Sequence, residues 1–310
     1  MIVVAGEALI DLVPGSAQAD GALPALLPQR GGGPYNTAMA LGRLGSPAAF
    51  CSRVSTDAFG EALLAELRAA GVDAAPVQRG PEPTTLAVAS IDADGSAGYG
   101  FYVEGTADRL FELPAALPEG TRALSLGTCS LVLEPGASAY EALLKREAER
   151  GVFTALDPNI RAGLIPNAAA YRARFRSWLP HVTLLKLSVE DAEWLADGSD
   201  VDAALTDWLA AGPAAAVLTR GGDGLSVRTR AGDEYAVPGE RVDVVDTIGA
   251  GDTVNAALLH RLAEHGALSP AEIASLDAEQ WRDILGFAAR AAAVTCSRAG
   301  AQPPYASELV

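Results

Sequence analysis

Short apolar runs alternate with amphipathic segments through the chain after residue 121. The runs predict strands because they are short and bounded by polar or turn-forming residues, whereas the amphipathic segments repeat their apolar residues at three- and four-residue steps, the period of a helix. The predicted strands are 123–126, 153–156, 182–187 and 215–219, and the predicted helices are 139–149, 168–178, 189–195 and 202–211. Such alternation indicates a parallel sheet with right-handed crossovers and helices on both faces.

The same patterns extend the predicted sheet at both ends of the chain. Further strands are predicted at 2–5, 48–54, 225–228 and 235–237. Further helices are predicted to end at Gly45 and at Gly71, to open at Asp252 and continue through Leu262, and to span 281–295. Ligands of such a sheet bind beyond the carboxyl ends of its strands, so the polar residues that follow those strands are candidates for a site.

Two β-rich segments, 83–89 and 98–103, flank a turn at 92–95 and predict a hairpin. Together with short strands before Arg30, they predict a small sheet separate from the main one. The alternative is two more strands of the main sheet. No repeat, linker or composition shift divides the chain, so we expect a single domain over residues 1–310.

Composition narrows the class of protein. The 310 residues are 49% apolar and carry a formal net charge of −16, which argues against nucleic acid or an anionic membrane as a partner. No apolar run is long enough for a membrane span, the N-terminus lacks the basic segment of a signal peptide, and the three cysteines are widely spaced. We therefore expect a cytoplasmic protein with reduced thiols. Its only lysines, Lys145 and Lys186, do not follow glycine, so the chain has no P-loop.

The segment 243–252 is the strongest chemical signal. A β-branched acidic run ends in the turn Gly249, Ala250 and Gly251, and a helix then opens at Asp252. Small residues at a helix N-terminus leave backbone N–H groups open to an anion. A carboxylate beside such a site suits phosphoryl transfer, because it can take the proton of the attacking hydroxyl. Taken alone, Asp252 could also be an ordinary first-turn acid.

A second glycine-rich segment precedes the first predicted helix. Gly31, Gly32 and Gly33 permit close backbone approach, and Asn36 offers both a donor and an acceptor to the paired hydroxyls of a sugar. By itself the segment indicates only a turn.

The two segments together resemble the paired signatures of the PfkB family of carbohydrate kinases, the ribokinase/fructokinase-like sugar kinases. The carboxyl-terminal string, an acidic residue followed by Asp-Thr-x-Gly-Ala-Gly-Asp, is met at every fixed position. The resemblance implies a ribokinase-like three-layer α/β/α sandwich whose small β-sheet, from about 8–30 and 84–104, is a lid over the sugar. It also implies transfer of the ATP γ-phosphoryl group to a sugar hydroxyl. Asp252 would be the base, and Gly249, Ala250 and Gly251 the anion hole.

The family likeness assigns further residues to ligands. The implied sugar-binding residues are Asp11, Gly32, Gly33, Asn36, Tyr102, Asn159 and Arg161, and the implied ATP-binding residues are Lys186, Ser188, Thr219, Gly221, Gly222 and Gly224. Glu190 would help to hold Mg²⁺ through water, and Asp246 with the Ile248 carbonyl would hold K⁺. One departure concerns the family's Asn-x-x-Glu motif, since Leu187 occupies the asparagine position here and Ser188 is the nearest polar substitute.

The sugar itself is less well specified. The residues 157–161 and 101–103 look most like those of fructokinases. A 2-keto-3-deoxygluconate kinase and a nucleoside or ribose kinase of the same fold remain alternatives, as does a catalytically silent sugar-binding relative. Arg161 could reach a substrate carboxylate, a phosphoryl oxygen or only a neighbouring acid. Relatives often pair through their lids, which implies a possible homodimer.

Overall fold

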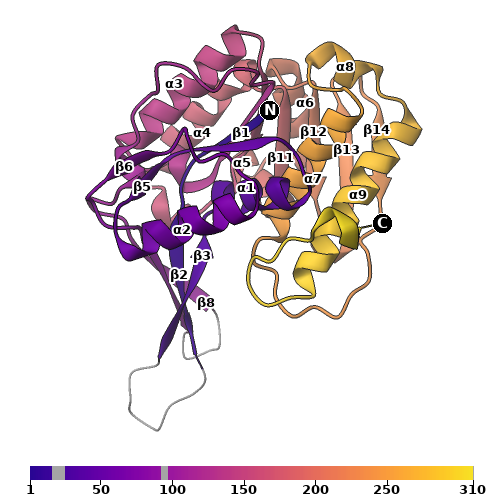
Figure 1. Cartoon of the computed structure of the whole chain (residues 1–310). Coiled ribbons are helices and arrows are strands. Elements are labelled where there is room, and N and C mark those ends of the chain that lie inside the picture. The colour runs from indigo at the N-terminus through magenta and orange to yellow at the C-terminus, as the bar shows by residue number, and fades with distance from the viewer. Residues whose placement is uncertain (16–24, 92–96, 310) are drawn as a thin grey trace.

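The computed structural model describes residues 1–15, 25–91 and 97–309. Its main sheet has eight strands in the order β14-β13-β12-β11-β10-β9-β1-β4 (Figure 1). Neighbouring strands from β4 to β12 are parallel, and β13 and β14 complete the sheet in antiparallel pairing. The strands are β1 (Ile2–Ala5), β4 (Ala48–Cys51), β9 (Ala123–Gly127), β10 (Phe153–Asp157), β11 (Leu184–Ser188), β12 (Ala215–Thr219), β13 (Leu225–Thr229) and β14 (Glu234–Val237). The predicted mostly parallel sheet is confirmed.

Helices cover both faces of this sheet, as alternate residues of the central strand illustrate. Ile2 and Val4 of β1 join one apolar cluster, and Val3 and Ala5 join the other. The first face is covered by α1 (Gly33–Arg43), α2 (Ala58–Ala69), α7 (Ala250–Glu264), α8 (Pro270–Ser275) and α9 (Ala278–Cys296). The second face is covered by α3 (Gly136–Glu149), α4 (Ala168–Trp178), α5 (Val189–Ala196) and α6 (Val201–Ala211). Strands buried on both faces read as continuous apolar runs, which is why the sequence revealed them.

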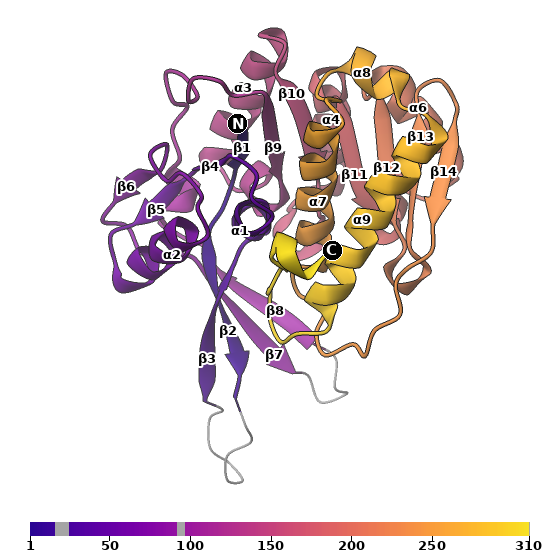
Figure 2. The ribbon, with the colours of Figure 1, turned by 45° about the vertical axis from the view of Figure 1, so that its right-hand side comes forward.

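A second sheet extends away from the main one (Figure 2). Its order is β3-β2-β7-β8, with β2 and β7 parallel and the outer pairs antiparallel. The strands are β2 (Leu9–Pro14), β3 (Leu26–Gly31), β7 (Leu86–Ile91) and β8 (Ala97–Tyr102). The predicted hairpin and separate small sheet are therefore confirmed, although the turn at 92–95 lies outside the described residues.

Several predicted boundaries were wrong. The strand predicted at 48–54 breaks after Cys51, because the Ser52 carbonyl accepts the Gln78 N–H and the chain turns away. Its continuation, β5 (Arg53–Ser55), pairs instead with β6 (Gln78–Gly80) in a two-stranded sheet. The last helix begins at Ala278, three residues earlier than predicted, because Asp277 caps it. The short helix α8 was not predicted.

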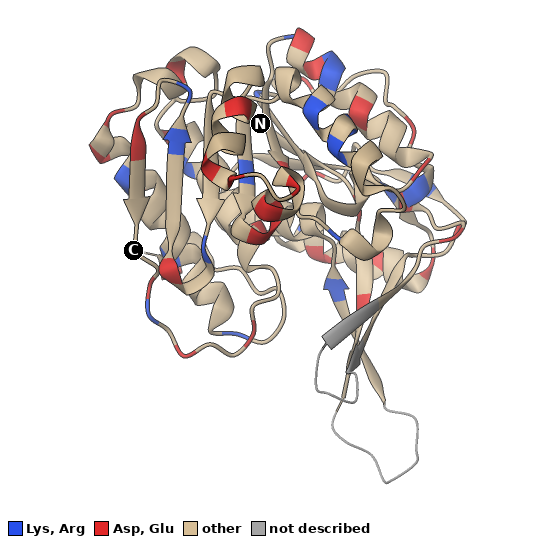
Figure 3. Cartoon of the chain, turned by 180° about the vertical axis from the view of Figure 1, so that it is seen from behind, with Lys and Arg blue, Asp and Glu red and all other residues tan. Residues whose placement is uncertain are grey.

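Ion pairs occur on the outer surface of the protein. On the side shown in Figure 3, acidic and basic residues are interspersed along helices and loops. Arg174, for example, pairs with both Glu134 and Glu141. Within the described residues, no helix combines the length and the apolar character that crossing a bilayer requires.

Candidate active site

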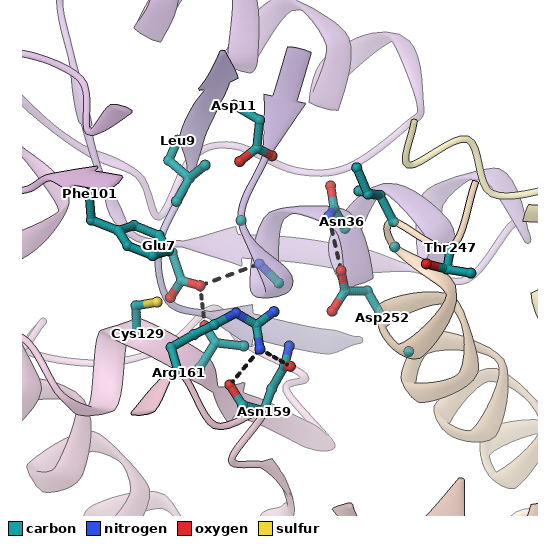
Figure 4. Close-up of a pocket in the computed structure, with 16 residues that line it drawn as sticks. Glu7, Leu9, Asp11, Asn36, Phe101, Cys129, Asn159, Arg161, Thr247 and Asp252 are labelled. Atoms are coloured by element: carbon teal, nitrogen blue, oxygen red, sulfur yellow. Dashed lines mark hydrogen bonds between the residues drawn. The ribbon is translucent and has the colours of Figure 1, made fainter. Parts of the chain in front are cut away.

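A cavity of about 270 Å³ lies where the second sheet meets the main sheet, and polar side chains converge on it. We call it the polar cavity. In Figure 4, Asp11 and Arg161 approach it from opposite sides, and Asn36 and Asp252 lie together on a third. Ten predicted residues line it, namely Asp11, Gly32, Gly33, Asn36, Asn159, Arg161, Ile248, Gly249, Gly251 and Asp252.

Asp252 is held at the start of α7 by contacts from α1. Asn36 Nδ2 donates to Asp252 Oδ2 at 2.9 Å, and Thr37 Oγ1 donates to the Asp252 carbonyl at 3.4 Å. Gly249 precedes the helix with a φ of 77°, a conformation that glycine adopts without strain. The helix thus begins two residues earlier than predicted, and Asp252 lies within its first turn. The residue Asp252 is 7% exposed and lines the cavity.

Burial sets the protonation of this carboxylate. Desolvation, reinforced by the negative charge of Asp157, raises the pKa of Asp252 to about 7, against the opposing effects of the Asn36 hydrogen bond, Lys186 and Arg161. An acid with a pKa near neutrality exchanges its proton readily at physiological pH. Asp252 is therefore electrostatically suited to accept a proton from a bound hydroxyl.

Glu7 anchors the opposite wall of the cavity and was missed from the sequence. Its carboxylate accepts hydrogen bonds from the backbone N–H groups of Gly33 (3.3 Å) and Ser130 (3.0 Å) and from the Thr128 hydroxyl. Burial raises the pKa of Glu7. A Cβ on Gly33 would lie 2.4 Å from Thr128 Cγ2, so only glycine lets α1 begin this close to the Thr128 turn. The sequence feature that could have identified Glu7 is an acidic residue just beyond a buried central strand.

Asp11 and Arg161 provide opposite charges across the cavity. Burial raises the pKa of Asp11 to about 6, and the positive charge of Arg161 acts in the other direction. Arg161 Nη1 donates to the Asn159 carbonyl (3.1 Å), to Asn159 Oδ1 (2.7 Å) and to the Ile160 carbonyl (3.2 Å). The guanidinium is thus held by its own loop, and its other nitrogens form no hydrogen bond with the residues that the structure describes.

A second cavity, of about 260 Å³, lies on the other side of the 249–251 turn. We call it the glycine-loop cavity because Thr219, Gly221, Gly222 and Gly224, the residues expected to bind ATP, line it. Its opposite wall is apolar and consists of Val242, Val244, Val254, Ala289, Ala292 and Ala293. Both cavities share Thr247 and Gly251 in their linings, so they meet at the turn. An apolar slot beside a glycine loop can take a flat base and its phosphates.

Five predicted residues lie outside both linings, namely Tyr102, Lys186, Ser188, Glu190 and Asp246. Tyr102 is 65% exposed, because successive side chains of β8 alternate and Phe101 is the one that faces the polar cavity. Ser188 caps α5 in a reciprocal box with Asp191, and Glu190 is exposed on the first turn of that helix. Lys186 is buried beneath the turn, where its Nζ bonds Asp157 Oδ2 at 2.8 Å. Tyr102, Lys186, Ser188 and Glu190 therefore border neither cavity.

Asp246 ties the glycine turn to the carboxyl-terminal loop. One oxygen accepts the Ile248 N–H at 3.0 Å, and the other accepts the Gly300 N–H at 2.8 Å. In the parts of the chain that the structure describes, no three acidic, histidine or cysteine side chains gather as a metal cage. A divalent ion would therefore need most of its ligands from a substrate and from water.

The arrangement of a sugar-sized polar cavity, a glycine-loop cavity and a carboxylate at their junction defines a phosphotransferase. A family model described as pfkB family carbohydrate kinase matches residues 1–308. A fructokinase from Rhizobium leguminosarum bv. trifolii is 41% identical, over 91% of this chain and 86% of its own length. Fructokinase-1 of Oryza sativa subsp. japonica is 33% identical, over 100% of this chain and 95% of its own.

Solved structures agree. The fructokinase with bound ATP from Xylella fastidiosa superposes with a TM-score of 0.89 at 27% identity, over 99% of this chain and 96% of the other. A fructokinase double mutant from Vibrio cholerae O395, in a fructose-, ADP- and potassium-bound form, gives a TM-score of 0.83 at 25% identity, over 97% and 93%. The chain belongs to the pfkB family of carbohydrate kinases. It is a phosphotransferase that acts on a sugar hydroxyl.

Proposed function

We propose that the protein is an ATP-dependent fructokinase. The observation that carries the proposal is the position of Asp252, a buried acid that lines the polar cavity directly after Gly251, a residue shared with the lining of the glycine-loop cavity. In the proposal the polar cavity takes the sugar, and the glycine-loop cavity takes ATP. Relatives named fructokinases, at 41% and 33% identity, support fructose as the sugar.

In this mechanism Asp252 takes the proton of the attacking sugar hydroxyl. Its bond to Asn36 keeps one oxygen fixed, so the carboxylate is already oriented when the sugar binds. The backbone N–H groups of Gly249, Ala250 and Gly251, at the N-terminus of α7, stabilise the charge that develops on the transferred group. Asp11, Gly33 and Asn36 hold the sugar hydroxyls, and their positions in the lining support this role.

Two ions belong to the proposal. Mg²⁺ would enter with ATP, neutralise phosphate charge and contact Glu190 through water, since the described residues offer no cage of their own. K⁺ would lie beside Asp246 and the Ile248 carbonyl, near the loop at Gly300. The hydrogen bonds from Ile248 and Gly300 to Asp246 support a coupling between that position and the glycine turn.

The second sheet is proposed to act as a lid on the sugar. Asp11 of β2 and Phe101 of β8 both line the polar cavity, so closing this sheet would exclude water from it. A homodimer through the lid is also proposed, since β3 is an edge strand that exposes Leu26 and Leu27. The unpaired thiols of Cys51, Cys129 and Cys296 fit a reducing cytoplasm.

The decisive experiment is an ATP-turnover screen with fructose, tagatose, ribose, glucose, 2-keto-3-deoxygluconate and adenosine. We expect the highest kcat/KM with fructose. A clear preference for the keto acid would instead assign Arg161 to a substrate carboxylate and would refute fructose as the substrate. A preference for adenosine or ribose would refute it as well.

A further inference from the structure

A small inner cavity lies behind Asp252, on the side away from the sugar. Its lining shares Gly33, Thr128 and Asp252 with the polar cavity, so these residues form the wall between the two. The volume open to the centre of a water molecule is about 10 Å³. A sphere of the size of one water occupies roughly 10–15 Å³, so a cavity with this much space for the centre of a water has room for a water molecule.

Two buried oxygen atoms of the lining residues lack donors among the described residues. Asp157 Oδ2 accepts from Lys186 Nζ at 2.8 Å, but no described residue donates to Asp157 Oδ1. Asn255 Nδ2 donates to Ser125 Oγ at 3.1 Å, and Asn255 Oδ1 likewise has no donor among the described residues. Asp157 is 3% exposed and Asn255 4%. Leaving such acceptors without a donor is costly, especially for a charged one.

We propose that the inner cavity is a binding site for one water molecule, which donates to Asp157 Oδ1 and Asn255 Oδ1 and so supports the catalytic carboxylate from behind. A water has two donors, which match the two acceptors. The hydroxyl groups of Thr37 and Ser125 also line the cavity and supply the further partners that a buried water uses. A cation is a poorer match, because Lys186 already neutralises Asp157.

The water links the base to the charge pair beneath the glycine turn. A hydrogen bond to Asp157 favours its ionised form, against the burial that raises its pKa and together with the Lys186 charge that lowers it. The Asp157 charge in turn contributes to the raised pKa of Asp252, where Lys186 and Arg161 act in the opposite direction. Asn255 is therefore a positioning residue: it leaves room for the water and accepts one of its hydrogen bonds, and the water keeps Asp157 charged.

Two substitutions at Asn255 compare an inner cavity from which water is excluded with one that still admits water. Asn255→Leu fills the space with an apolar side chain and expels the water. Asn255→Ala also removes the bond to Ser125 but leaves room for water to reach Asp157. We expect kcat to fall by about tenfold or more in the leucine variant, as for loss of a hydrogen bond to a charged group. The acid limb of kcat/KM should move to lower pH as the Asp157 charge is lost. In the alanine variant the acid limb of kcat/KM should lie at the same pH as in the parent.

Thr253→Val is the matched control. Thr253 lies on the same helix, is buried, and bonds Thr295 Oγ1, which retains its own bond to the Ala291 carbonyl. The acid limb of kcat/KM in the Thr253→Val variant should lie at the same pH as in the parent. Crystal structures of the parent and of both Asn255 variants, with one parent crystal grown in Rb⁺, complete the test. A single water between Asp157 and Asn255 supports the proposal. An anomalous Rb⁺ peak there, no ordered solvent, or equal pH limbs in the leucine and alanine variants would overturn it.

Discussion

Replacing Asp252 by asparagine should remove catalysis while leaving the site in place. The introduced amide oxygen can still accept the Asn36 hydrogen bond, which now measures 2.9 Å, so the geometry of the wall is kept. The amide cannot accept a proton at neutral pH. Loss of a general base typically costs roughly 10²–10⁴ in rate, so we expect that fall in kcat with ATP affinity nearly unchanged.

The same substitution should stabilise the fold above neutral pH. The pKa of Asp252 rises from 3.8 to about 7 on folding, chiefly through desolvation. Between these values the folded state holds a proton that the unfolded state releases, so the free energy of unfolding falls as pH rises from about 4 to about 7. A shift of about 3 units corresponds to about 4 kcal/mol. The Asp252→Asn variant has no carboxylate at this position and does not lose stability in this way. Its free energy of unfolding should therefore exceed that of the parent by nearly this amount at pH 8, and the difference should vanish near pH 4.

Three measurements check this prediction. Steady-state ADP release gives kcat, calorimetric titration with ATP gives affinity, and denaturant unfolding at pH 4 and pH 8 gives stability. In the parent, kcat/KM should rise with pH through about 7, as Asp252 ionises. Asp283→Asn is the control, since that acid lies on α9 and pairs with Arg261 and His265. Turnover of the Asp252 variant within a few-fold of the parent would exclude Asp252 as the base.

Three further predictions concern the surroundings of the base. K⁺ should raise the rate over that in a bulky organic cation, because it would order the turn that Asp246 holds; equal rates would count against the ion site. Gly249→Ala should lower kcat strongly with little loss of folded protein, because its Cβ would lie 2.6 Å from Ala301 Cβ and the turn would shift; a parent-like kcat disproves this. Arg161→Lys should leave fructose turnover less affected than that of a keto acid, which loses a two-pronged pair worth roughly 2–5 kcal/mol; fructose turnover far below that of the keto acid, with the keto acid alone sensitive to the substitution, contradicts our choice of sugar.

The site residues that could be predicted from the sequence are those whose positions depend on local backbone constraints. Gly33 and Gly249 mark helix starts with little room for a Cβ, and Asp252 follows such a start at a fixed spacing. Side chains whose role depends on tertiary neighbours were harder to place. Glu7 matters only because Ser130 approaches it from a turn 123 residues away, a contact with no local pattern.

Strand phase explains another error. Successive side chains of β8 point to opposite faces, so only one of Phe101 and Tyr102 can face the cavity. Because both residues are aromatic, the hydrophobic pattern does not show which of them is the buried one. Lys186 illustrates a different limit. Its place on a buried strand was clear, but its partner Asp157 belongs to the neighbouring strand, so the sequence alone could not distinguish a ligand contact from an internal ion pair.

The contact between Asn36 and Asp252 has a consequence for the making of the enzyme. The two residues are 216 positions apart, yet α1 and α7 lie side by side so that they meet. During synthesis the ribosome delivers Asp11, Gly33 and Asn36 early and the glycine turn with its carboxylate late. A chain cut short before residue 249 would carry the proposed sugar-binding groups but would lack the proposed anion hole and base. With the roles proposed for these residues, kinase activity therefore requires that synthesis has passed residue 252.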